Sequence, residues 1–276
     1  MKRTTYIFIG ILVSVLVILM AGVVYISFQK SETNSYTLTL SEKILRTEFS
    51  GIRAVKVYAN DTRRVWLDEA CVNVVSSTDG KTRLLSPESE YLKISQNADT
   101  LVICLDLTTY DLPKQKKEYL IPALQAKGLQ LTIEADSNLA FVANAIRGLR
   151  TRIDRLHADS LTTYIRGGEL RLDSCEIRAF CVDGDGVTFN AHQSIIPHLY
   201  LDLDGVRNWG VHESVIGTEH LTGSGVYHNN LQRGECKKMI WTPKKEDAEL
   251  RLTIREKGSL ICLLYTSPSP RDPKTS

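Results

Sequence analysis

Four aspartates in two short motifs are the residues best placed to do chemistry. Asp183 and Asp185 are separated by one glycine, and Asp202 and Asp204 are separated by one leucine. Residues two apart point to the same face of a β-strand, so each pair would present two carboxylates together. Carboxylate oxygens on neighbouring strands could hold Ca²⁺. Asp-Gly sequences also form ordinary turns. The four aspartates are therefore metal candidates only, and we predict no metal site.

A calcium-dependent enzyme is the alternative that these aspartates raise. Calcium-dependent polysaccharide lyases resemble this pattern in outline, since they place an arginine base beside an acidic groove. Arg178 and Arg207 would be the available arginines. The sequence contains no G-x-S-x-G, H-E-x-x-H, phosphate-binding loop or G-x-G-x-x-G motif. We predict a protein that is not an enzyme and that has no cofactor, and keep the lyase as the alternative.

Histidines and aromatic residues supply two further candidate sites. Imidazole is a common metal ligand and acid–base group, but no two histidines have the H-x-x-x-H spacing. We expect them in turns and on the surface. Trp209, Trp241 and Tyr227 could form a sugar-stacking platform, although aromatic residues also fill cores. The histidines are His157, His192, His198, His212, His220 and His228.

Six cysteines are too few for a disulfide scaffold in a chain of 276 residues. Cys175 and Cys181 are the closest pair along the sequence and the best local candidates for a disulfide. The simpler expectation is that most of the cysteines are small buried thiols in a β-sheet core.

Residues 6–28 form an uncharged apolar segment, and roughly 20 such residues in a helix cross a bilayer. Lys2 and Arg3 precede the segment, so the positive-inside rule places the rest of the chain outside the cytoplasm. A cleaved secretory signal is the alternative, but the apolar run continues beyond the small residues Ala21 and Gly22. We predict an uncleaved membrane anchor, with the body in the periplasm or outside the cell.

The predicted organisation is an anchor at 1–28, a polar tether at 29–44, a β-domain at 45–261 and a tail at 262–276. Within the tail, residues 262–272 read CLLYTSPSPRD and resemble a translated sequencing adapter, so we expect 262–276 to be non-native. The net charge is only +2. That balance gives no electrostatic footprint for nucleic acid, which we do not expect as a partner.

Short segments rich in β-branched residues, such as 52–58, 71–75 and 101–107, predict strands separated by polar turns. After Gly128, alternating apolar segments recur with starts roughly 7–21 residues apart. Short strands without hairpin signals favour a stack of parallel coils, so we predict an all-β solenoid. A β-sandwich is the alternative, because it also has short alternating strands.

Three stretches together resemble the auto-transporter adhesin "head GIN domain" family of bacterial envelope proteins. They are Phe49-Ser50-Gly51-Ile52 with the strand at 54–58, Leu92-Lys93-Ile94, and the segment 119–124 leading to Gly128. The resemblance spans about residues 45–260. It implies a right-handed parallel β-helix and an adhesive role, and it brings no catalytic residues.

These observations predict a membrane-anchored, exported structural or binding module of a bacterial envelope, which is adhesin-like. An extended solenoid face could bind an envelope glycan or protein through many contacts. Self-association through open coil edges is a further possibility.

Overall fold

The structure is a computed structural model that describes residues 12–21, 35–60, 65–110, 123–231, 235–254 and 262–265. The chain divides into two compact units, Met1–Ser35 and Tyr36–Ser276. Each unit has its own architecture.

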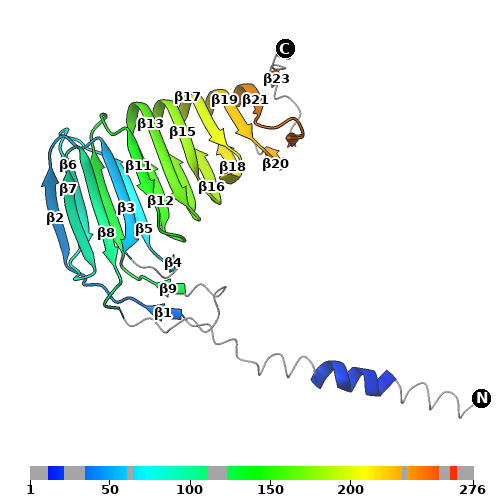
Figure 1. Cartoon of the computed structure of the whole chain (residues 1–276), viewed down its shortest axis with the longest axis horizontal. Helices are drawn as coiled ribbons and strands as arrows, with labels where there is room; N and C mark the ends of the chain where they lie inside the picture. Colours follow the sequence, from blue (N-terminus) through cyan, green and yellow to red (C-terminus); the bar gives the residue numbers. More distant parts are fainter. Residues whose placement is uncertain are drawn as a thin grey trace, which may run out of the picture. The chain divides into compact units, whose positions relative to one another are not determined.

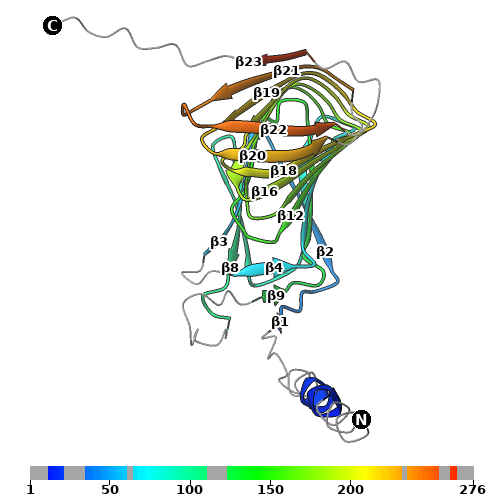
Figure 2. The same cartoon turned by 90° about the vertical axis from the view of Figure 1, so that its right-hand side faces the viewer.

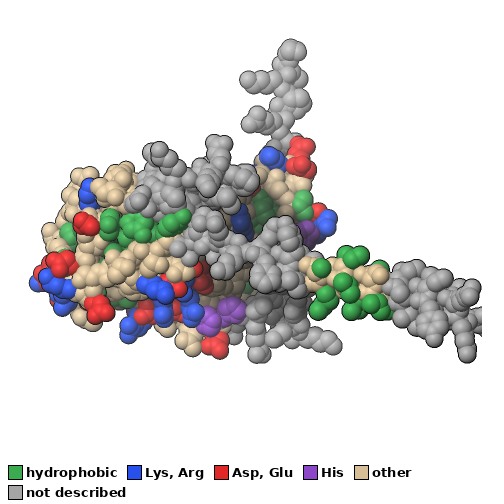
Figure 3. Space-filling view, turned by 90° about the horizontal axis from the view of Figure 1, so that it is seen from below, with side chains coloured by type: hydrophobic (Ala, Val, Ile, Leu, Met, Phe, Trp, Pro, Cys, Tyr) green, Lys and Arg blue, Asp and Glu red, His purple; other side chains and the backbone are tan. Residues whose placement is uncertain are grey.

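In the first unit, residues 12–21 form an α-helix. Its large hydrophobic side chains are exposed, and hydrophobic groups cover the side of the helix seen in Figure 3. Among the residues that the structure describes, no helix has the length and hydropathy to cross a bilayer. The rest of the predicted anchor, 6–11 and 22–28, lies outside the described residues. The anchor therefore remains a prediction.

The second unit consists of strands in four sheets (Figure 1). The two main sheets have ten and eight strands, and the smaller ones have three and two. The ten-stranded sheet runs β23 (Cys262–Tyr265), β21 (Glu235–Pro243), β19 (Val215–Gly223), β17 (Ile195–Asp202), β15 (Glu176–Asp185), β13 (His157–Arg166), β11 (Phe141–Asn144), β3 (Ala54–Asn60), β8 (Thr100–Asp106) and β7 (Leu92–Asn97).

The eight-stranded sheet faces the ten-stranded one (Figure 2). It runs β18 (Val206–His212), β16 (Val187–His192), β14 (Glu169–Asp173), β12 (Arg150–Asp154), β5 (Cys71–Ser76), β10 (Gln130–Ala135), β6 (Thr82–Pro87) and β2 (Ile44–Phe49). The small sheets contain β1 (Ser35–Thr37), β9 (Ala123–Gln125) and β4 (Trp66–Asp68), and β20 (Val226–Leu231) with β22 (Glu249–Ile254).

From β11 to β19 the chain alternates between the two main sheets, and each strand pairs in parallel with the strand two places along. Inward residues therefore stack in columns that are apolar, as strands covered on one face require. One column contains Leu161, Phe180 and Leu199, which are 19 residues apart in the sequence and fully buried. Phe180 meets Phe189 of the opposite sheet at a centroid distance of 5.7 Å. The two sheets thus share one core.

The all-β prediction is confirmed, but a regular parallel stack over the whole of 45–261 is not found. In the N-terminal part, β6 pairs antiparallel with both β2 and β10, and β7 pairs antiparallel with β8. Of these pairs, only β7 and β8 form a hairpin with a short connection, whereas β6 pairs with strands that are distant in the chain. The β-sandwich alternative agrees with the structure in its two facing sheets and shared core, but the strand pairs from β11 to β19 are parallel, whereas immunoglobulin-like sandwiches are antiparallel.

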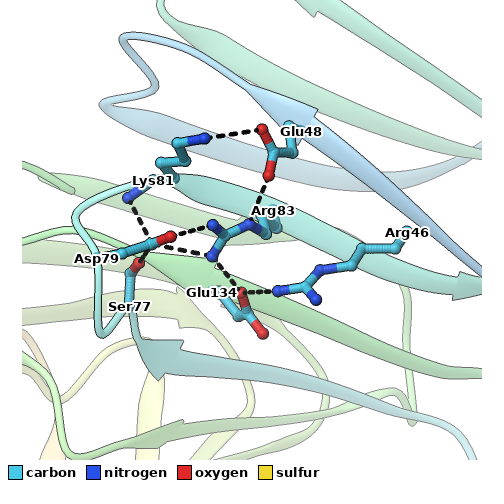
Figure 4. A network of polar contacts seen from close by, with 7 residues as sticks. All are labelled: Arg46, Glu48, Ser77, Asp79, Lys81, Arg83 and Glu134. Carbon is cyan, nitrogen blue, oxygen red and sulfur yellow. Dashed lines mark hydrogen bonds and ion pairs between the residues drawn. The ribbon is translucent and has the colours of Figure 1, made fainter.

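A charged network joins the antiparallel strands of the N-terminal part (Figure 4). The guanidinium of Arg83 on β6 is almost buried and contacts three carboxylates, those of Glu48, Asp79 and Glu134. Glu134 also accepts a hydrogen bond from Arg46 at 3.1 Å. The hydrogen bond from Arg83 is the main cause that holds the pKa of Asp79 below its usual range. The network adds ionic contacts between β2, β6 and β10, which are also paired through their backbones and place Leu84, Leu131 and Ile133 in the core.

Glu219 is the most deeply buried carboxylate among the described residues, where Asp106 and Asp173 are also buried. Glu219 on β19 lies in the inward column between Leu199 and Met239 and is 1% exposed. Burial raises the pKa of Glu219 to about 7, against contacts with Trp209 and Cys236 that lower it. One of its carboxyl oxygens has no hydrogen-bond partner among the described residues. The folded state therefore favours the protonated form of Glu219 more than the unfolded chain does.

We expect stability to depend on pH through Glu219. Its folded pKa lies above the usual 4.5, so its contribution is complete below about pH 4.5 and is lost as pH rises through about 7. The loss amounts to about 3 kcal/mol at pH 8. Glu219→Gln should be more stable than the parent at pH 8 and should remove this slope. Urea unfolding from pH 4.5 to 8 measures both, with the exposed Glu246→Gln as control. A slope that survives in Glu219→Gln contradicts the assignment.

Candidate binding groove

Glycines recur at the corners where the chain passes from the ten-stranded to the eight-stranded sheet. Gly148, Gly167, Gly186 and Gly205 are each 19 residues apart and stand just before or at the start of β12, β14, β16 and β18. The irregular spacing predicted from apolar segments is therefore wrong for this part of the chain. A search for equally spaced glycines would have found the true period.

These corners form a groove of about 660 Å³ on the surface of the second unit. We call it the corner groove. The side chains that can meet a ligand there include an indole, three guanidinium groups and two carboxylates. They belong to Trp66, Arg147, Arg150, Arg207, Glu169 and Asp185.

Trp66 lies at one end of the corner groove because β4 joins the first corner. The backbone N–H of Leu67 donates to the carbonyl of Arg147 at 2.8 Å, and Trp66 bridges to Arg147. The indole is 41% exposed and lies directly over Gly148. A Cβ at Gly148 would stand 2.6 Å from the indole nitrogen and 2.2 Å from the carbonyl oxygen of Leu67. Only glycine allows this approach.

Asn144 fixes the shape of the first corner from inside. Its side-chain amide is fully buried, donates to the carbonyl of Leu149 at 2.8 Å and accepts from the N–H of Ile146 at 3.0 Å. It also donates to the Thr151 hydroxyl at 3.0 Å. These bonds satisfy the amide, so its burial carries no unpaired polar group.

Arg147 crosses the groove and is held by its neighbours. Its guanidinium pairs with Asp185 at 2.8 Å, and its aliphatic stem lies over Gly167. The Nε atom is buried and has no hydrogen-bond partner among the described residues. Arg147 and Asp185 therefore neutralise each other and tie the first corner, at Gly148, to the third, at Gly186.

Arg150 and Arg207 are exposed, and the described part of the chain contains no ion pair for either. Arg207 sits at a β-bulge, because Val187 pairs with Val206 while Thr188 pairs with Asn208. A bulge turns the extra side chain out of its regular direction. The Arg207 guanidinium consequently lies over Gly186, within 3.3 Å of where a Cβ would be.

The predicted metal candidates lie at the same corners but in different environments. Asp185 pairs with Arg147, and Asp183 is exposed and accepts from the N–H of Gly184 at 2.7 Å. Among the described residues, no group of three or more His, Cys, Asp or Glu side chains gathers as a metal site.

Asp202 and Asp204 lie close together, but the positive group between them is the side chain of Lys244 and not a metal ion. The Lys244 ammonium lies 2.6 Å from Asp202 and 2.9 Å from Asp204. Burial alone would raise the pKa of Asp204, but hydrogen bonds from Tyr227, Lys244 and Ser224 outweigh it and lower the pKa. Of the two predicted arginines, Arg207 lies in the corner groove, and Arg178 lies 3.7 Å from Asp159, outside the groove.

The expectation that aromatic residues fill the core is confirmed for Trp209 and Trp241, so these two and Tyr227 form no exposed sugar-stacking platform. Both tryptophans are inward-facing and at most 4% exposed, and Tyr227 meets Trp241 edge-on at 5.9 Å. They fill the core, because inward positions of the parallel columns demand large apolar groups. The exposed tryptophan of the site is Trp66, which the sequence pattern did not single out.

The histidines separate onto the two sheets. His192 and His212 stack at 5.1 Å on the eight-stranded sheet, and His198 and His220 lie 5.8 Å apart on the ten-stranded sheet. Tyr200 stacks on His220 at 4.4 Å. His157 and His228 are exposed on β13 and β20. None of them lines the corner groove.

The candidate disulfide between Cys175 and Cys181 is not formed, in agreement with the simpler expectation of free thiols. Both are free thiols, as are the other described cysteines outside the tail. Cys175 is buried at the entry to β15, whereas Cys181 is partly exposed on the outer face of that strand. Six residues of extended chain span about 20 Å, which is several times the Cα separation that a disulfide allows. Burial raises the pKa of Cys175 to about 11, so its thiol is unreactive.

No protein-family model matches the chain, and no curated protein matches it. One solved structure that matches the chain is a "putative adhesin" from Bacteroides fragilis. It is 13% identical, with a TM-score of 0.41, covering 83% of this chain and 100% of that one. Another is a "putative lipid binding protein" from Parabacteroides distasonis, which is 8% identical with a TM-score of 0.30 and covers 83% of this chain and 99% of that one.

At these identities and TM-scores neither likeness carries an argument about function. The resemblance to the head GIN domain family has no matching family model and remains a prediction.

We expect Gly148→Ala to damage the groove more than the folded body. Gly148 has φ +81°, and the added methyl group would collide with Leu67 and displace Trp66. Gly128→Ala is the matched control, because its φ is +87° but nothing lies within 4 Å. The φ penalty of about 1 kcal/mol is then common to both. Acrylamide quenching should change only in Gly148→Ala, since the other two tryptophans described are buried. Equal effects of the two variants would contradict the close approach.

Proposed function

We propose that the chain is a membrane-anchored, exported binding module of a bacterial envelope, without catalysis, whose ligand is a glycan held in the corner groove. The observation that carries this proposal is the 41% exposed indole of Trp66 in a groove lined by hydrogen-bonding side chains. Aromatic faces stack on the apolar faces of sugar rings, and guanidinium, carboxylate, hydroxyl and amide groups bind hydroxyl groups.

The arrangement of the strands supports a finer proposal for the fold. We take β11–β19 as a parallel β-solenoid of two-stranded coils, on the evidence of the alternating parallel pairs. Crossovers between parallel strands are right-handed in nearly all proteins, so we assign the right-handed sense. Such a stack repeats its corners along one edge, which makes the groove elongated.

The enzyme alternative has less support from the same residues. Lys244 occupies the space between Asp202 and Asp204, and Arg178 is directed to Asp159. The aspartates and the arginine that a calcium-dependent lyase would use are therefore already paired with other side chains of the protein. We keep the non-catalytic proposal.

A glycan array tests the binding role. The full chain, in detergent micelles, should bind at least one polysaccharide on the array. Trp66→Ala should weaken that binding by about tenfold, because the stacking contact with the sugar ring is lost. Tyr164→Ala is the control, because Tyr164 is 37% exposed and lies outside the groove. Retention of no glycan, or equal binding by Trp66→Ala, would refute the groove as the binding site.

Membrane anchoring is supported by the exposed apolar helix at 12–21 and by the apolar sequence around it. We expect the protein to remain in the membrane fraction after carbonate washing. Protease added to spheroplasts should digest the β-domain, because the domain lies outside the cytoplasm. Digestion only in inside-out vesicles would reverse the orientation, and full release by carbonate would exclude an anchor.

A further inference from the structure

We propose that the ligand of the corner groove is an anionic polysaccharide whose sugars carry carboxylate or sulfate groups, bound by Arg150 and Arg207. This inference rests on the proposed glycan-binding function and adds the chemical class of the ligand. The charges of the groove, the positions of the two arginines and the place of the indole each support it.

The groove has an unbalanced positive charge. Of its three arginines, Arg147 is neutralised by Asp185 at 2.8 Å, and no residue that the structure describes forms an ion pair with the other two. Glu169 accepts a weak hydrogen bond from Asn190 at 3.4 Å. Two exposed guanidinium groups therefore face solvent with one remaining carboxylate between them. Guanidinium forms paired hydrogen bonds with carboxylate and with sulfate-like oxyanions, and these bonds are stronger than those to neutral groups.

The separation of the two arginines fits a polymer better than a single anion. Arg150 stands in the same outward column as Glu169, Thr188 and Asn208, one coil apart at each step. Neighbouring strands are about 4.8 Å apart, so the coils of Arg150 and Arg207 are about 14 Å apart. One small anion cannot bridge that distance, whereas a chain with repeated charges can contact both.

The β-bulge aims the distal arginine into the groove. Without the bulge, Arg207 would continue the regular alternation of β18, but the extra residue places its guanidinium over Gly186. At the other end, Trp66 supplies a stacking face. Cations spaced along the groove and an indole at its end together favour a charged sugar chain over an uncharged one.

Affinity electrophoresis of the full chain in detergent tests the inference. The probes are polygalacturonate for carboxylate, dextran sulfate for sulfate and dextran as the neutral polymer. We expect retardation by at least one of the two anionic polymers and less by dextran. Arg150→Gln and Arg207→Gln should each weaken the anionic interaction by about tenfold. Arg178→Gln is the matched control, because Arg178 is exposed and lies outside the groove.

Thermal unfolding confirms that each variant is folded. Three results would overturn the inference. They are equal retardation by dextran and the anionic polymers, an Arg178→Gln effect as large as that of Arg150→Gln, and single-stranded DNA bound as tightly as the better anionic polymer. If neutral sugars bind in a way that depends on Trp66, the proposed function survives and only the anionic ligand falls. If Trp66→Ala changes no glycan interaction, the proposed function itself falls.

Discussion

Parallel hydrogen bonding between alternate strands is the constraint on which the rest of this structure depends. Once β13 pairs with β15 and β14 with β16, every residue is placed above its equivalent one coil earlier. Inward positions must then be apolar through the whole stack, and each corner must turn within the same few residues. The core and the groove are two consequences of the same register.

The core tolerates polar groups only where the stack provides partners for them. Asn144 meets this condition, because three hydrogen bonds inside the first corner satisfy its amide. Glu219 meets it in part, since one of its oxygens has no described partner, and burial therefore favours its neutral form. Arg83 shows the opposite solution, in which a nearly buried cation is surrounded by three carboxylates at the edge of the N-terminal strands.

The groove lies at the corners of the stack, where close approach of neighbouring groups leaves room only for glycine. Glycine at the corners lets backbone and aromatic groups approach closely, as the contact between Gly148 and Trp66 shows. The space so created is lined by the first outward residues of successive strands, which are free to be polar. A binding surface of this kind needs no loop insertion, because the repeated turn itself forms the surface.

Much of this protein was readable from sequence. Alternating apolar residues determined the all-β body, because only inward strand positions are shielded from water. What the sequence did not reveal were contacts between residues that are far apart in the chain. Trp66 meets Gly148, and Asp204 meets Lys244, through pairings that no local pattern encodes. The same holds for Trp209 and Trp241, whose inward direction depends on register and not on residue type. Tertiary structure decided these points, because strand pairing sets which distant residues meet and which side of each strand faces the core.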